Sequence, residues 1–154
     1  MDPYEEKLKA FIHENQLQAE HLSFNQSCHS VTEAALAVHA SAEDFVKNIC
    51  LIAASGDLVV AIVKGEDRAS PKRISDALGI PPPRLAKPEE ILTLTGYPCG
   101  GTPSFGYPAT VLIDPRVLEK EFVYSGGGSE NALVKISTRE LLRSSRGRII
   151  QIRK

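Results

Sequence analysis

The chain has 154 residues, a formal net charge of −1 and three cysteines. This length fits a single domain, which we expect to span residues 1–154 and to bury its core without disulfides. The near-neutral charge excludes a protein that coats nucleic acid, and no run of about 18 apolar residues is present to span a membrane. Because the first residues are acidic and no apolar leader follows them, we expect a cytoplasmic protein with no membrane partner.

The charges are distributed unevenly along the chain. Residues 1–46 contain eight acidic and two basic residues, whereas residues 135–154 contain seven basic residues and a single acidic one, Glu140. Such a basic end permits a local phosphate-binding surface, although a run of charge is more often a solvated helix face. The sequence leaves both interpretations open.

The first part of the chain predicts two helices and a weak strand. Asp2 and Pro3 form a helix cap followed by proline at the first helical position, so we expect a helix from there to about residue 15. Residues 20–25 alternate weakly and indicate a short strand. Residues 30–33 have the spacing of a capping box, which favours a second helix to about residue 38.

An apolar stretch at residues 45–54 predicts a strand that is covered on both faces. It is interrupted only by the pair Lys47 and Asn48. Because burying an unpaired ammonium is costly, Lys47 either reaches solvent at the rim or is held in place for a function. A turn at residues 55–57 and an apolar run at residues 58–63 predict the second strand of a hairpin.

The remaining segments predict short helices and strands. Helices are expected from Ser70 to near Gly79 and from Pro88 into a glycine-rich segment. Four strands and a further helix are expected, with the strands at residues 109–113, 121–124, 133–136 and 149–152 and the helix after a capping box at residues 137–140. Because strands outnumber helices and connections are short, we expect an α+β fold in which helices surround a mixed, partly closed β-sheet.

The segment at residues 95–106 places four glycines and two prolines between two apolar runs. Glycine is costly inside a helix or strand, and proline lacks the N–H that a sheet needs, so this segment must be a loop. Where Cβ atoms are missing, a ligand can approach the main chain, whose N–H groups suit a carbonyl oxygen or a phosphate. A purely structural turn explains the same glycines.

Familiar nucleophile and metal motifs do not fit this sequence. Ser104 lacks the G-x-S-x-G elbow and has no histidine that can be placed beside it, and Cys99 has no identifiable base. Cys28, His29 and His39 match no standard zinc spacing and lack a fourth ligand. We therefore expect no metal.

Four segments occur in a specific order: residues 29–35 (HSVTEAA), residues 45–49 (FVKNI), the pattern T-G-Y-x-x-G-G within residues 95–106, and residues 123–127 (VYSGG). In this combination the chain resembles the YbaK/ProX-type aminoacyl-tRNA deacylases, which are related to the editing domain of bacterial prolyl-tRNA synthetases. The similarity spans roughly residues 25–142.

The resemblance implies hydrolysis of the ester between a wrongly attached amino acid and the 3′-terminal adenosine of a tRNA, of the alanyl- or cysteinyl-tRNA(Pro) type. Mischarged tRNA is the implied partner, with an aminoacyl-tRNA synthetase as a second one, and no cofactor is implied. The resemblance assigns catalytic roles to Lys47, Asn48, Gly100 and Gly101. It assigns substrate binding to eight further residues: Thr32, Gly96, Tyr97, Pro103, Phe105, Gly106, Ser125 and Gly126.

The resemblance leaves several points open. Pro103 stands three residues before Gly106 rather than two, and where the family offers aspartate or histidine this chain has only Glu130 or Asn131. Lys47 can bind the terminal phosphate or orient the ester. Two other functions stay in view, namely a non-catalytic tRNA- or synthetase-binding module of the same fold, and a small-molecule hydrolase or nucleotide-binding protein that uses the glycine-rich loop.

Overall fold

The computed structural model describes residues 2–25 and 31–154. Within these residues the helices are α1 (Pro3–Glu14), α2 (Val31–Val38), α3 (Pro71–Leu78), α4 (Pro88–Thr95) and α5 (Thr138–Ser145), with short 3-10 helices η1 (Ala42–Asp44) and η2 (Pro115–Glu119). The strands are β1 (Ala19–Ser23), β2 (Val46–Ile52), β3 (Leu58–Lys64), β4 (Arg84–Leu85), β5 (Thr110–Ile113), β6 (Phe122–Gly126), β7 (Ala132–Ser137) and β8 (Arg148–Ile149). None of the described helices is long and apolar enough to cross a membrane.

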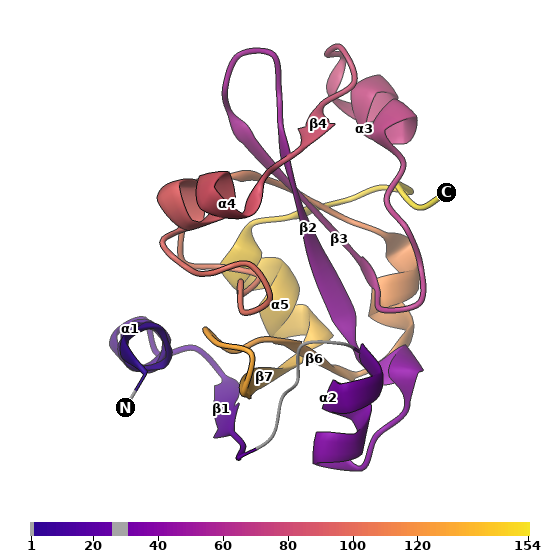
Figure 1. Ribbon diagram of the computed structural model, residues 1–154. Helices are drawn as coiled ribbons and strands as arrows, with labels where there is room; N and C mark the ends of the chain where they lie inside the picture. The colour runs from indigo at the N-terminus through magenta and orange to yellow at the C-terminus, as the bar shows by residue number, and fades with distance from the viewer. Residues whose placement is uncertain (1, 26–30) are drawn as a thin grey trace.

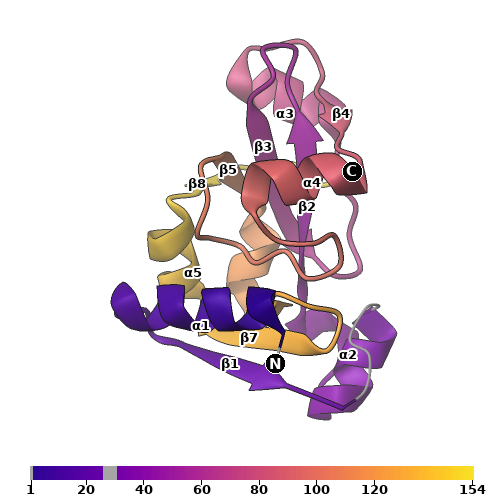
Figure 2. The same ribbon diagram turned by 60° about the vertical axis from the view of Figure 1, so that its left-hand side comes forward.

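The strands form two sheets, with the order β4-β2-β3-β5-β8 in the larger and β1-β7-β6 in the smaller. The larger sheet is mixed, because β5 pairs in parallel with β3 and β8 while β2 pairs antiparallel with β3 and β4. Figures 1 and 2 show the β2–β3 hairpin crossing the molecule, with α3 near its tip and the smaller sheet at its other end. The predicted α+β class is confirmed, but the strands form two sheets linked by a bridge between Phe45 and Tyr124.

The helix-capping signals have the expected structures. Asp2 accepts hydrogen bonds from the first free N–H groups of α1, and Ser70 does the same for α3. Gly79 ends α3 in the left-handed conformation, with φ of 66°. Ser30, the predicted cap of α2, lies outside the described residues.

The strand predictions differ from the structure at two short elements. β4 was not predicted, because two residues are too few to show an alternating pattern. The strand expected at residues 149–152 is β8, which covers only Arg148–Ile149. Beyond it the chain leaves β5, because Ile152 is buried in the core and its N–H donates to the carboxylate of Asp114.

The β2–β3 hairpin is covered by apolar residues on both faces, as its sequence predicts. One core cluster contains Val46 and Cys50, and the other contains Leu51. Because successive side chains of a strand point to opposite faces, Asn48 points toward the first cluster and Lys47 toward the second. The two polar side chains of β2 are therefore presented on different faces of the sheet.

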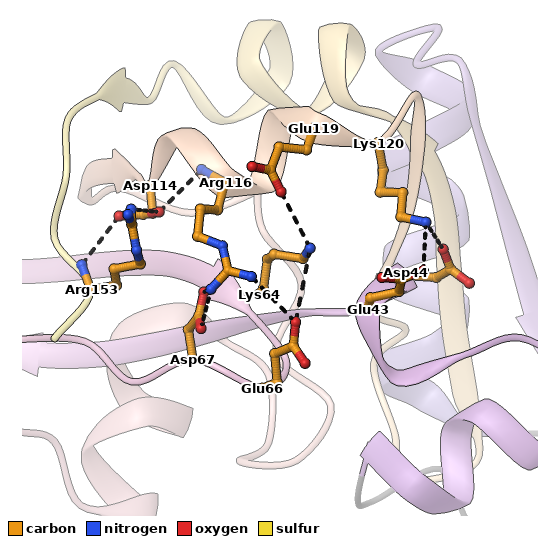
Figure 3. A network of polar contacts seen from close by, with 10 residues as sticks. All are labelled: Glu43, Asp44, Lys64, Glu66, Asp67, Asp114, Arg116, Glu119, Lys120 and Arg153. Carbon is orange, nitrogen blue, oxygen red and sulfur yellow. Dashed lines mark hydrogen bonds and ion pairs between the residues drawn. The ribbon is translucent and has the colours of Figure 1, made fainter.

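A network of ion pairs fixes the segment that follows β3 (Figure 3). Arg116 of η2 donates to both carboxylate oxygens of Asp67, at 2.7 and 2.9 Å. The nearly buried Lys64 pairs with Glu119 at 3.5 Å. Arg116 and Lys64, two cations that could otherwise attract an anion, are thus occupied within the protein.

Asp114 lies at one end of the same network and is completely buried. Its carboxylate accepts the main-chain N–H groups of Ile152 and Arg153 and the Arg153 guanidinium, at 2.9 to 3.2 Å. Burial alone would raise the pKa of this carboxyl group, but these hydrogen bonds hold the pKa below its ordinary value. Asp114 therefore anchors the C-terminal segment against the larger sheet.

We predict that Asp114→Ala lowers the free energy of unfolding at neutral pH by about 2–4 kcal/mol, because buried N–H donors lose their acceptor. Since the pKa of Asp114 is lower in the folded state, its contribution is present above about pH 4 and is lost as the pH falls below that value. Urea unfolding across this range checks both statements. Asp76→Ala, which removes an exposed carboxylate, is the control, and equal effects of the two variants would contradict the prediction.

Candidate functional site

A pocket of about 200 Å³ lies beside the first half of β2, where β4 does not extend. Its walls come from β2, the loop between α4 and β5, the ends of β6 and β7 that face each other, and α2. The polar and glycine residues that line it are Lys47, Asn48, Gly100, Thr102, Ser125 and Gly126. The apolar lining residues include Ala34, Phe45, Ile91, Tyr124 and Leu133. The pocket thus joins all four segments that the sequence singled out.

The side-chain amide of Asn48 connects these walls. Its Nδ2 donates to the main-chain oxygen of Thr102 at 3.0 Å and to Oγ of Ser125 at 3.1 Å. Its Oδ1 accepts from the hydroxyl of Ser104 at 2.6 Å, and the hydroxyls of Ser104 and Ser125 lie 2.7 Å apart. One side chain therefore fastens β2 to the glycine-rich loop and to β6.

The main chain of Asn48 lies on an open strand edge. The carbonyl of Phe45 accepts from Gly65 on the β3 side, whereas the carbonyl of Cys50 accepts from Ala86 on the β4 side. Main-chain groups point alternately to the two sides of a strand, so those of Asn48 point to the β4 side. β4 pairs only with the end of β2, at Leu51 and Ile52, so no strand of the larger sheet pairs with Asn48 on this side. An open edge of the larger sheet therefore borders the pocket.

Lys47 is half-buried and forms no hydrogen bond or ion pair within residues 2–25 and 31–154. Its burial lowers the pKa of its ammonium, the positive charge of Arg68 lowers it further, and Asp67 opposes both effects. Asp67 itself is held by Arg116. Lys47 is consequently a cation with a cationic neighbour and without a counter-ion of its own.

The glycines of the site have different roles. Gly100 is exposed, has φ of 90°, and has an N–H without a partner in the described chain. The N–H of Gly101 is used within the loop, and a Cβ there would lie 2.5 Å from the nitrogen of Ser129. A Cβ on Gly126 would lie 2.1 Å from the oxygen of Thr102. Gly101 and Gly126 allow close packing, whereas Gly100 presents a donor.

Five of the residues assigned to the substrate pocket do not line it: Gly96, Tyr97, Pro103, Phe105 and Gly106. Tyr97 and Phe105 are buried in the main core, where they belong to the largest cluster of apolar side chains. Gly96 ends α4 in the left-handed conformation. Gly106 lines a separate hollow next to the C-terminal end of α5. The loop thus turns into the core immediately after Thr102.

Several other candidates lie away from the pocket or outside the description. The side chain of Thr32, together with Cys28 and His29, lies outside the described residues. Glu130 and Asn131 are exposed and do not line the pocket. The described residues contain no group of three or more histidine, cysteine or acidic side chains that could hold a metal.

The cysteines near the site do not form a nucleophile with a base. Cys99 lines the pocket, but no histidine of the described chain does. Burial raises the pKa of Cys50 to about 12, so its thiol stays protonated near neutral pH. The groups that the pocket offers to a reaction are therefore hydrogen-bond donors and a cation.

Sequence analysis missed Thr102 and set Ser104 aside because it does not resemble a catalytic serine. Their importance lies in hydrogen bonds to Asn48, which is more than fifty residues earlier in the chain. No local spacing rule records a contact over that separation. The only signal was indirect, since a polar residue in an apolar strand needs a partner.

A family model for the aminoacyl-tRNA editing domain matches residues 25–144. The chain belongs to this family, in its YbaK/ProX-type branch. The uncharacterized protein YwhH of Bacillus subtilis (strain 168) is 23% identical to this editing domain over 120 residues, which cover 77% of this chain and 76% of YwhH. The predicted family is therefore confirmed.

Two solved structures resemble this editing domain along nearly its whole length. The hypothetical protein APE2540 matches with a TM-score of 0.87 and 29% identity, over 96% of this chain and 99% of that chain. A proposed trans-editing enzyme for prolyl tRNA synthetase matches with a TM-score of 0.92 and 25% identity, over 100% and 99% of the two chains. The residues matched by the family model include every polar lining residue of the pocket.

We predict that Arg68→Gln raises the pKa of Lys47, because it removes a nearby positive charge, and that Asp67→Asn lowers it. Titration of the lysine side-chain NMR signals measures both shifts directly. Arg73→Gln, on the exposed surface of α3, is the matched control and should leave the pKa of Lys47 unchanged. If the pKa of Lys47 is unchanged in both the Arg68→Gln and the Asp67→Asn variants, the described environment is contradicted.

Proposed function

We propose that this editing domain is a trans-acting deacylase that hydrolyses the ester of a mischarged tRNA, of the alanyl- or cysteinyl-tRNA(Pro) type. The observation that carries the proposal is the pocket beside β2, which is small, is bordered by the main chain of Gly100 and Asn48, and lies next to Lys47, an ammonium with no bonded counter-ion among the described residues. Family membership and the likeness to a proposed trans-editing enzyme support the same substrate class.

The size of the pocket supports a small amino acid as the part that is selected. A synthetase site built for a larger amino acid rejects one that lacks a methylene by only about 1–3 kcal/mol, so a second, smaller pocket is needed to remove the error. The volume of about 200 Å³ suits a small side chain joined to ribose. Larger residues, including the correct one, are excluded by the packed walls.

The chemistry needed is attack of water on the ester carbonyl. A bond forms between the water oxygen and the carbonyl carbon, the bond to the ribose oxygen breaks, and the water proton passes to that oxygen. Negative charge develops on the carbonyl oxygen, and each preorganised donor aimed at it is typically worth about 10²–10³ in rate. The N–H groups of Gly100 and Asn48, two residues that line the pocket, are the donors that we assign to this role. A neighbouring ribose hydroxyl of the substrate relays this proton from the water to the leaving oxygen, and the second water proton leaves with the released acid.

We assign Lys47 to a phosphate of the tRNA 3′ end. Two neighbouring cations without a bonded counter-ion, Lys47 and Arg68, suit an anion better than a neutral ester. The side chain of Lys47 also lies on the other face of β2 from Asn48. On this assignment, Lys47 positions the terminal nucleotide while the main chain stabilises the reacting carbonyl.

The test is release of amino acid from a panel of mischarged tRNAs by the purified protein. We predict that Lys47→Ala lowers the rate on the best substrate by about 10²-fold or more, while Lys72→Ala, an exposed lysine of α3, has no effect. If Lys47 holds phosphate, the same variant should act normally on a 3′-aminoacyl-adenosine that lacks phosphate.

Other outcomes separate the alternatives. A wild-type protein that leaves the whole panel intact would overturn the deacylase proposal. If such a protein still bound tRNA or a synthetase, and Lys47→Ala bound equally well, the chain would be a non-catalytic module of the same fold. Loss of activity on aminoacyl-adenosine as well as on tRNA would reject phosphate as the group that Lys47 holds.

A further inference from the structure

The hydrogen bonds around Asn48 determine how its amide is oriented. The main-chain oxygen of Thr102 has lone pairs and no hydrogen, so the atom of Asn48 that faces it must be the NH₂ group. The other amide atom, Oδ1, is therefore the acceptor for the hydroxyl of Ser104. This assignment follows from the partners alone.

The same reasoning places every proton in a closed ring. Asn48 Nδ2 donates to Ser125, so the hydroxyl of Ser125 is free to donate to Ser104. The hydroxyl of Ser104 in turn donates to Oδ1 of Asn48. Both N–H bonds of the amide and both hydroxyl protons are thus used within the protein. A lone pair on Oδ1 is left, and it cannot donate to an ester carbonyl.

The two serines of the ring are buried, and Asn48 is partly buried. Ser104 is completely buried and Ser125 is 2% exposed. The described residues contain no buried side-chain nitrogen or oxygen without a hydrogen-bond partner. Removing one member would leave donors or acceptors of the others without partners, which costs about 1–3 kcal/mol for each buried group. The three side chains consequently form one unit.

We propose that Asn48 is a positioning residue, which together with Ser104 and Ser125 sets the width of the pocket. The ring joins β2 to the loop and to β6, and it grips the carbonyl of Thr102, against which Gly126 packs at close range. All three segments contribute lining residues to the pocket. The proposal rests on the deacylase function and specifies its selectivity: the ring holds the walls at the separation that admits a small amino acid ester.

The test compares Asn48→Ala, Ser104→Ala and the double variant. A shift of about 1 Å in a reacting group can lower the reaction rate about 10²-fold. We expect both single variants to lose kcat/KM by a factor that approaches this size. Because the residues act as a unit, kcat/KM of the double variant should be no lower than that of the more impaired single variant. Independent roles would instead multiply the two losses in kcat/KM. Ser145→Ala, a buried serine outside the ring, is the matched control.

Selectivity separates positioning from a general loss of folded protein. Both single variants should act relatively better on a larger aminoacyl ester, such as a prolyl one, than on the alanyl one. Thermal unfolding confirms that each variant is folded at the assay temperature. If Ser104→Ala retains wild-type kcat/KM and selectivity while Asn48→Ala is inactive, the amide contacts the substrate directly and the proposal is overturned.

A measurement without substrate distinguishes this proposal from the proposed function. In the free protein, the side-chain amide protons of Asn48 should exchange slowly with water, and Ser104→Ala should make them exchange faster. Slow exchange in a protein that hydrolyses none of the panel would reject the deacylase but retain the ring. Fast exchange in the wild-type protein would overturn the ring, whatever the activity.

Discussion

The docking of the glycine-rich loop onto β2 and β6 is the constraint on which the pocket depends. The loop cannot be fixed by regular secondary structure, because its glycines and prolines form no ladder or helix. Instead, the amide of Asn48 binds the carbonyl of Thr102 and the hydroxyls of Ser104 and Ser125. One polar side chain on a largely apolar strand thereby holds three separate segments of the chain together.

This arrangement explains why the site is built mainly from main-chain groups. Gly101 and Gly126 let the loop approach neighbouring backbone more closely than any Cβ would allow. The strand edge at Asn48 is open because β4 ends before reaching it, and Gly100 holds its N–H at the same pocket. Main-chain donors are rigid and need no side-chain ordering, which suits the stabilisation of charge that develops during ester hydrolysis. Selectivity can then come from the walls alone.

Much of the fold could be predicted because its signals are local. Asp2, Ser70 and Gly79 mark helix ends through chemistry that involves only a few neighbouring residues. The identity of the pocket was harder to predict, since the link between Lys47 and the loop came from a family resemblance and not from spacing. Tyr97 and Phe105 belong to the core, yet within a loop no periodicity marks an aromatic residue as buried. The roles of Thr102 and Ser104 depend on tertiary contacts, which leave no pattern in the sequence.

The measurement that tests this account most directly is a crystal structure with a non-hydrolysable 3′-aminoacylamido-adenosine carrying alanine. We predict that the amide carbonyl, which stands for the ester, lies within hydrogen-bond distance of the N–H groups of Gly100 and Asn48. The alanine side chain should face the wall that the ring of Asn48, Ser104 and Ser125 supports. A ligand whose carbonyl is bound by the side-chain amide of Asn48, or one seated outside the pocket beside β2, would contradict it.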